Sequence, residues 1–139
     1  MAIAILKVPV SEIALAWHHA FPLLETANSP GEEMVPEEVV VDLLAGTKQL
    51  WIGENKTFAC LTEIRSRDDK KFVLIYMLGG TLVRRWYLDF FLFLYAWGRA
   101  QGAGWLEIQY PRPGWERLLH PLGFTRHEND PDILIKEIK

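Results

Sequence analysis

Four side chains in the C-terminal two thirds of the chain have the chemistry needed for proton transfer: Glu63, Glu107, Tyr110 and His120. A carboxylate can accept a proton directly or through a water molecule, and an imidazole titrates near neutral pH. Each residue also has a plainer interpretation. Glutamates on strands usually face solvent, a tyrosine at the end of a strand can be a rim residue, and a histidine beside Pro121 is usually a surface or capping residue.

A second group of residues suits an anionic ligand. Gly79 and Gly80 are followed by the pair Arg84 and Arg85, and guanidinium groups bind anionic oxygens strongly. The net charge of −3 argues against a general nucleic-acid-binding protein, so we expect no nucleic-acid partner. The charge is uneven, because residues 1–42 hold seven acidic residues and only one lysine. The basic side chains are therefore concentrated in the remainder of the chain.

Several other kinds of site are not predicted. Cys60 is the only cysteine, so an intramolecular disulfide and a cysteine-based metal site are excluded. His18 and His19 are adjacent and cannot share one helix face, so no metal site is expected. The N-terminal residues lack a basic segment followed by a long apolar run, and the apolar run 86–100 is too short to cross a bilayer. We therefore expect a cytoplasmic protein without a membrane partner.

The elements that must position these residues follow from periodicity and turn signals. We predict one domain, 1–139, with an α/β (α+β) fold in the order β-α-α-β-β-β-α-β-α-β. The expected strands are 3–8, 49–53, 57–65, 71–78, 105–110 and one or two after 124; the expected helices start at Ser11, Pro36, Trp86 and Trp115. Pro22 is expected to kink or end the first helix. The helix between strands 71–78 and 105–110 predicts that these two strands are parallel.

This order resembles the GNAT acetyltransferase superfamily over nearly the whole chain. The resemblance is carried by FVLIYMLGG, the helix ending in AWGRAQGAGWLEI, then GWERLLHPLGF and the final ILIKEI. It implies a mixed, mostly antiparallel sheet with one central parallel strand pair. Gly123 is expected to make the turn out of the last helix and Phe124 to fill the core. More narrowly, QLW, TEI, AWGRAQG and GWERLL look like GNAT-like proteins of tailed-phage genomes, which would place the protein in host cytoplasm or in a virion.

The resemblance also implies a binding site for acetyl-CoA where the parallel strands part. In GNAT enzymes the pantetheine pairs with the first strand of this pair, here Tyr76, Met77 and Leu78. The pyrophosphate lies on a loop of pattern Q/R-x-x-G-x-G/A, but here Gly79 and Gly80 come early and Arg84 and Arg85 stand at the helix start. Two alternatives follow. The arginines replace part of the glycine cradle, or they are surface residues and Trp86 fills the site.

The resemblance leaves more than one hypothesis about activity open. The usual general acid of the superfamily is a tyrosine four residues before the corner glycine, a position held by Leu119. One hypothesis is an acetyl-CoA-dependent N-acetyltransferase that acts on an unknown amine. The other is a catalytically inactive GNAT-like phage protein, which would bind a protein partner or be associated with the virion. The aromatic helix 86–100, or strand 133–138, is expected to bury apolar surface against a second chain. The third hypothesis is an unrelated α+β domain that self-associates in this way.

Overall fold

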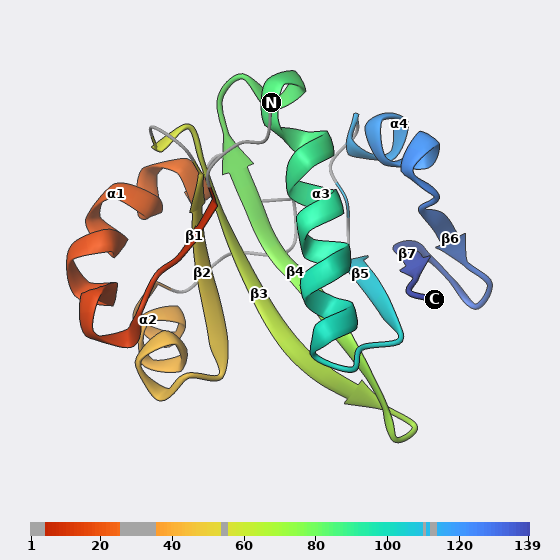
Figure 1. Ribbon diagram of the computed structural model, residues 1–139, viewed down its shortest axis with the longest axis horizontal. Helices are drawn as coiled ribbons and strands as arrows, with labels where there is room; N and C mark the ends of the chain where they lie inside the picture. Colours follow the sequence, from red (N-terminus) through yellow and green to blue (C-terminus); the bar gives the residue numbers. More distant parts are fainter. Residues whose placement is uncertain (1–4, 26–35, 54–55, 110, 112–113) are drawn as a thin grey trace.

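A seven-stranded mixed sheet forms the centre of the computed structural model (Figure 1). The structure describes residues 5–25, 36–53, 56–109, 111 and 114–139. The strands lie in the order β1-β2-β3-β4-β5-β7-β6. Their bounds are β1 Ile5–Lys7, β2 Lys48–Gly53, β3 Phe58–Arg67, β4 Lys70–Gly80, β5 Trp105–Gln109, β6 Thr125–His127 and β7 Asp130–Glu137. The helices are α1 Ile13–Glu25, α2 Pro36–Ala45, α3 Val83–Ala100 and α4 Trp115–Leu119, with short 3-10 turns at Val10–Glu12 and His120–Leu122.

The predicted parallel pair is confirmed. β4 and β5 are parallel neighbours, joined through α3, and every other pairing in the sheet is antiparallel. In Figure 1, α3 crosses in front of this pair. A strand–helix–strand unit places its strands in parallel because the helix returns the chain to the starting edge. The sheet therefore matches the mixed, mostly antiparallel arrangement predicted from the sequence.

Several predicted element boundaries are wrong. The β3–β4 hairpin turns through two residues, Asp68 and Asp69, both with positive φ (52° and 63°), instead of through the expected 66–70 loop. Such two-residue turns match the twist of the strands, and aspartate tolerates this conformation. Pro22 lies inside α1, which continues to Glu25. Ala20 and Leu24 on either side of it are fully buried, so packing holds the helix past the proline. Ser11 is not a cap, because it lies within the first 3-10 turn.

Two hydrophobic clusters lie on opposite faces of the sheet. One contains α1 and α2 with Leu50 and Leu61, and the other contains α3 with Trp51 and Cys60. Because consecutive strand residues alternate between faces, β2 and β3 supply both clusters. The indole Nε1 of Trp51 donates to Thr62 Oγ1 at 2.8 Å, which satisfies the one polar atom of this buried ring.

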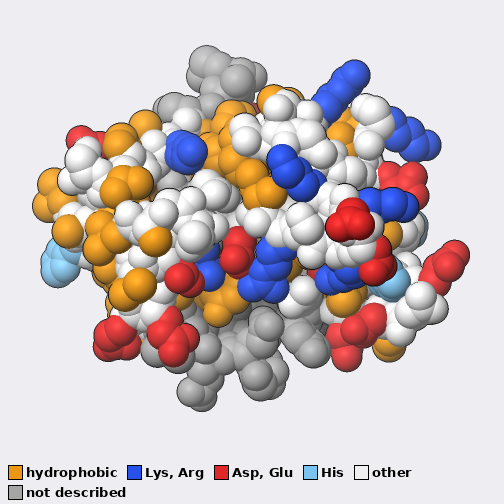
Figure 2. Space-filling view, turned by 90° about the horizontal axis from the view of Figure 1, so that it is seen from below, with side chains coloured by type: hydrophobic (Ala, Val, Ile, Leu, Met, Phe, Trp, Pro, Cys, Tyr) orange, Lys and Arg blue, Asp and Glu red, His pale blue; other side chains and the backbone are white. Residues whose placement is uncertain are grey.

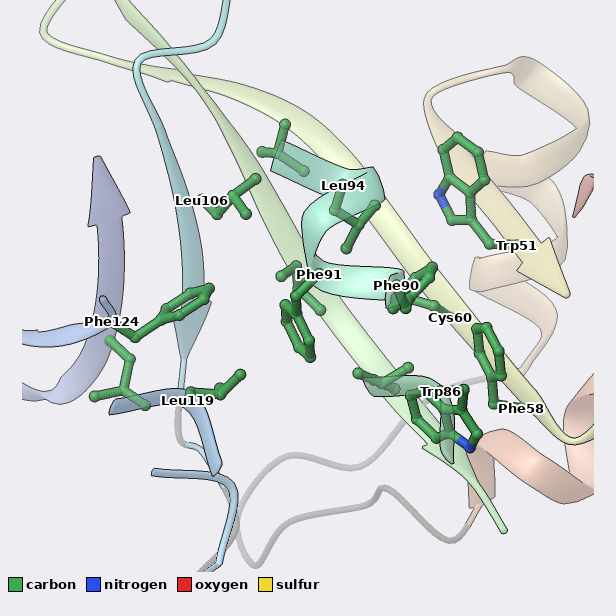
Figure 3. Close-up of a cluster of buried hydrophobic side chains, with 14 of the residues drawn as sticks. Trp51, Phe58, Cys60, Trp86, Phe90, Phe91, Leu94, Leu106, Leu119 and Phe124 are labelled. Carbon is green, nitrogen blue, oxygen red and sulfur yellow. The ribbon is translucent and has the colours of Figure 1, made fainter. Parts of the chain in front are cut away.

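The aromatic residues of α3 find partners within the chain. Trp86, Phe90 and Phe91 are buried in the cluster shown in Figure 3, and Phe93 and Trp97 both pack edge-on against Trp51. The large apolar side chains that remain exposed on this helix are Leu88 and Leu92. Strand 133–138 lies mostly in β7, which is paired on both sides, and β6 forms the edge that the terminal strand was expected to cover. Self-association through α3 stays a prediction, whereas β7 offers no free edge.

The Gly-Phe corner has the role predicted for it. Gly123 has φ of 97°, a conformation that suits glycine, and it ends the 3-10 turn after α4. Phe124 then enters the α3 cluster, with its ring edge-on to Phe91 at a centroid distance of 5.6 Å (Figure 3). The corner thus joins the last helix and the closing hairpin to the core.

Replacing Phe124 by alanine should strongly destabilise the fold. The ring is 2% exposed, so its removal leaves a cavity and should lower the free energy of unfolding by about 3–5 kcal/mol. Urea denaturation measures the change. Leu92→Ala, at a side chain that is 59% exposed, is the control and should shift the value by less than about 1 kcal/mol. Equal losses in the two variants would contradict the packing described for the corner.

Candidate functional site

The parallel pair β4–β5 is joined at only two register positions. Val73 lies opposite Leu106 and Leu74 opposite Glu107. Beyond them β4 continues to Gly80 and β5 to Gln109, but within the described residues no further pairing joins these strands. The far side of β5 remains fully paired with β7. The two strands therefore part after Leu74 and Glu107, and β4 presents backbone groups along the side that faces β5.

A β-bulge lies in β4 where the strands part. Leu61 is opposite Met77, but the next residue of β3, Thr62, is opposite Ile75, so Tyr76 has no register partner of its own. Tyr76 and Met77 both pack with the α1–α2 cluster, whereas Leu78 packs with the α3 cluster. Bulges bend a strand and re-aim its groups, and they are common beside active sites. The sequence-predicted residues Tyr76, Met77 and Leu78 thus lie along the free stretch of β4.

The predicted glycine loop is instead the end of a strand. Gly79 and Gly80 belong to β4 and lie opposite Ala59 and Phe58. A Cβ on Gly80 would come within 2.3 Å of the carbonyl oxygen of Thr57, so close strand packing explains this glycine. Thr81 and Leu82 alone connect β4 to α3. The connection is therefore shorter than a phosphate-binding loop with the expected glycine pattern.

Arg84 and Arg85 lie in the first turn of α3, which begins three residues earlier than predicted. Both side chains are exposed, the turn contains no acidic residue, and no side chain caps it. The N-terminal end of a helix carries partial positive charge, so this end and the two guanidinium groups favour an anion together.

Trp86 is part of the core beneath this turn. Its side chain is 2% exposed and stacks on Phe58 with 4.1 Å between ring centroids (Figure 3). The indole Nε1 donates to the Thr81 carbonyl oxygen at 2.7 Å and so fixes the short connection. The ring is thus committed to packing against β3.

The sheet brings the two candidate glutamates into one row. Glu63 lies opposite Leu74 on β4, and Leu74 lies opposite Glu107 on β5. Residues directly opposite one another share a face, and two strand spacings separate the glutamate backbones by about 10 Å. Leu106 and Ile108 pack with α3, so Glu107 between them points to the face of α1 and α2.

Glu107 is fully buried and bound by three side chains. Arg67 Nη1 and Nη2 donate to its two oxygens at 2.8 and 3.1 Å, Trp105 Nε1 donates at 3.0 Å, and Gln109 Nε2 donates at 2.8 Å. Burial alone would raise the pKa of Glu107, but these hydrogen bonds outweigh it and hold the pKa below its usual value. Glu107 is therefore ionised at neutral pH, and both of its oxygens accept hydrogen bonds from neighbouring side chains.

Glu63 has a more open environment. Its side chain is 19% exposed, Arg65 donates to it at 2.9 Å, and Lys48 Nζ lies 3.6 Å away. Lys48 also binds Asp42 of α2 at 2.6 Å and lies over the ring of Tyr76, 5.2 Å from its centroid. Glu63 is thus connected through Lys48 to the residue at the bulge.

Of the other two proton-transfer candidates, only His120 lies within the described residues, and it is not part of this row. His120 is exposed in the 3-10 turn after α4, beside the fully buried Leu119. Tyr110 lies outside the described residues. No group of three or more metal-ligating side chains occurs in the described segments, and no helix among them is long and apolar enough to cross a bilayer.

Sequence reasoning missed Arg67, Trp105 and Gln109. The alternation Trp105-x-Glu107-x-Gln109 places three side chains on one face of β5, and this pattern could have revealed the local part of the network. Arg67 is 40 residues from Glu107 in sequence, and only the register of the sheet brings the two together.

Comparisons with known proteins were made at three levels. No protein-family model matches the chain, and a search of curated proteins finds no significant match. Solved structures do match. A GNAT-family acetyltransferase from Listeria monocytogenes has a TM-score of 0.64 at 9% identity, over 97% of this chain and 94% of that one. The Drosophila melanogaster polyamine N-acetyltransferase that forms N-acetylagmatine has a TM-score of 0.63 at 12% identity, over 97% and 99%.

A third similar structure, AtaTR bound with acetyl-CoA, has a TM-score of 0.60 at 12% identity, over 99% of this chain and 94% of that chain. In all three comparisons the likeness covers 97% or more of this chain. At these identities it concerns the architecture alone. The chain has the fold of the GNAT acetyltransferases.

Proposed function

We propose that this protein binds acetyl-CoA between β4 and β5 and transfers the acetyl group to an amine. The observation that carries the proposal is the parting of the parallel pair after Leu74 and Glu107, with a bulge at Tyr76 in the β3–β4 pairing of the same stretch of β4. A strand with unpaired backbone groups can bind an extended amide-containing chain in the manner of an added strand. The pantetheine arm is such a chain.

The described residues also fit the phosphate end of acetyl-CoA. The coenzyme ends in phosphates, and α3 begins with a positive helix end beside Arg84 and Arg85. Because the connection from β4 contains only Thr81 and Leu82, fewer backbone N–H groups are available than in a longer glycine loop. Arginine charge is therefore expected to contribute a larger share of the phosphate binding.

When bound, acetyl-CoA would supply an activated thioester. Backbone N–H groups at the bulge would hold the acetyl oxygen, and the sheet face of α1 and α2 would present the amine for direct attack. Glu63 would accept the proton of the amine through water, because it is the partly exposed carboxylate of the row. As the C–N bond forms, the C–S bond of the thioester would break, and the CoA thiolate would leave and take a proton from solvent. Glu107 would position its neighbours, since its oxygens already accept four hydrogen bonds.

The acceptor is proposed to be a cationic amine. The segment from Val10 to Glu25 and helix α2 contain five acidic residues and no lysine or arginine: Glu12, Glu25, Glu37, Glu38 and Asp42. In Figure 2, Lys and Arg side chains gather mainly over the centre and right of the molecule, away from the left-hand part where α1 and α2 lie. An acidic surface attracts cations. The structural likeness to a polyamine N-acetyltransferase also supports this class.

A second candidate function is binding without catalysis. Leu119 occupies the position of the usual general acid and is fully buried, and His120 beside it points to solvent. In this alternative the protein, of bacterial or phage origin, would bind a partner protein or coenzyme without turnover. One neighbour of the same fold, AtaT, is solved with the C-terminus of the antitoxin AtaR and acetyl-CoA. Release of free CoA from acetyl-CoA in the presence of polyamines separates the two functions.

Acetyl-CoA should bind to the wild-type protein, and the affinity should fall with salt because exposed charges are screened. Removing both guanidinium groups in Arg84→Ala/Arg85→Ala should cost about 1.5–3 kcal/mol for each charge-assisted hydrogen bond to phosphate that is removed. Isothermal titration calorimetry measures both effects. Arg99→Ala, at the opposite end of α3, is the control and should leave the affinity unchanged. A tight affinity that is indifferent to salt and to the double substitution would place the phosphates elsewhere.

Glu107→Gln should reduce stability and change its pH dependence. The pKa of Glu107 is lower in the folded state than in the unfolded chain, so the ionised group stabilises the fold above the unfolded pKa. That contribution is lost as pH falls through the folded pKa, and the glutamine variant should lack it. We expect a loss of about 1–3 kcal/mol at neutral pH. Urea denaturation between pH 3 and pH 7, values chosen to span the range of carboxyl titration, measures it. An unchanged slope of stability against pH would contradict this role.

A further inference from the structure

We infer that Gln109 binds the acceptor amine through its side-chain carbonyl oxygen, and that Arg67 and Glu107 hold this oxygen in place. The inference rests on the proposed function, because it concerns the acceptor of the same transfer reaction. It assigns a binding role to Gln109 and a positioning role to the Arg67–Glu107 pair behind it. Four features of the structure carry it.

The orientation of the Gln109 amide follows from its partner. Nε2 lies 2.8 Å from Oε2 of Glu107. An ionised carboxylate can only accept hydrogen bonds, so the glutamine must present its NH₂ group to Glu107. Its carbonyl oxygen is then directed away from the Glu107 carboxylate. In the described residues no hydrogen bond to this oxygen is found, and the Gln109 residue is partly exposed.

The position of Gln109 places this oxygen where the strands part. Gln109 lies two residues beyond Glu107, the last residue of β5 paired with β4, and on the same face. Tyr76 lies two residues beyond Leu74 on β4 and packs with the α1–α2 cluster, so it lies on this face too. The two side chains therefore flank the start of the gap from opposite strands.

The face also distinguishes the acceptor from the coenzyme. The helix end that carries Arg84 and Arg85 belongs to α3, which covers the opposite face of the sheet. A coenzyme whose phosphates lie at that end would approach the gap from the α3 side. Gln109 on the other face would then meet the acceptor.

Stacked and hydrogen-bonded side chains support Gln109 from behind. The Arg67 guanidinium lies over the ring of Phe72, 4.7 Å from its centroid, and Phe72 stacks on Trp105 with 4.9 Å between centroids and 6° between planes. Trp105 and Arg67 both bind Glu107, which binds Gln109. A side chain held in its binding geometry loses less conformational entropy when the ligand arrives. An amide carbonyl oxygen accepts hydrogen bonds and therefore suits an N–H donor of a cationic amine.

The test measures binding of 1,4-diaminobutane to the protein saturated with CoA, by calorimetry, in wild type and in Gln109→Met. Methionine keeps the length of the side chain but has no amide. We expect the Kd of the diamine to rise about tenfold or more, as for loss of a hydrogen bond to a charged group. The Kd of CoA should change less than twofold. Gln101→Met, at the exposed glutamine that ends α3, is the matched control and should change neither value.

A second measurement tests the positioning role of Glu107. Glu107→Gln should also weaken diamine binding, and adding it to Gln109→Met should weaken binding no further, because both act through the same oxygen. Gln109→Met leaves Arg67 and Trp105 bound to the carboxylate, so the first test stands even where Glu107→Gln fails to fold. Additive losses would overturn the positioning role.

The outcomes separate this inference from the function it rests on. If CoA and acetyl-CoA do not bind the wild type, both the proposed function and this inference are wrong. If they bind but the diamine does not, or binds Gln109→Met as well as wild type, the inference is wrong while the coenzyme site stands. Weaker diamine binding with unchanged CoA affinity supports both.

Discussion

The rest of the structure depends on the two-position contact between the parallel strands β4 and β5. Within the described residues the register between them pairs Val73 with Leu106 and Leu74 with Glu107, and then the strands part. Three features meet at this point: the bulge at Tyr76, the buried Glu107 and the start of the free stretch of β4. A sheet that stayed paired to the ends of these strands would have no edge to offer an extended ligand. The crossover through α3 makes the pair parallel, and the same helix brings its positive end to the side of the gap.

Two sets of side-chain contacts, one on each face of the sheet, hold β4, β5 and the start of α3 in place. On the α3 face, Trp86 stacks on Phe58 and binds the Thr81 carbonyl oxygen, so the short connection into the helix is held by the core. On the other face, Arg67 reaches from the tip of the β3–β4 hairpin to Glu107 on β5. The Glu107 carboxylate is fully buried, so losing Arg67 would leave a buried charge without its cationic partner. The Arg67–Glu107 pair therefore specifies the relative position of the strands on which the gap depends.

The sequence predicted the order of elements and the parallel pair because strong local signals mark them. The apolar run of β4, the aromatic helix and the β5 run follow one another, and a strand–helix–strand unit has one common topology. Element ends were predicted less well. The strand signal of KFVLIYML does not show that Gly79 and Gly80 still pair with β3, since that depends on Ala59 and Phe58. The hydrogen bonds of Glu107 could not be predicted either, because they also depend on how the strands pair. A glutamate on a strand is usually solvated, and only the register reveals that Arg67, Trp105 and Gln109 enclose it.

The central claim is that the free stretch of β4 binds acetyl-CoA, and amide hydrogen exchange measured by NMR tests it most directly. The account predicts that adding acetyl-CoA slows exchange in the segment Tyr76–Leu78, where no described residue of β5 pairs with β4. Amides of β7, which is paired on both sides, should be unaffected. Saturation with acetyl-CoA that leaves Tyr76–Leu78 unprotected, or that protects only α1 and α2, would contradict it.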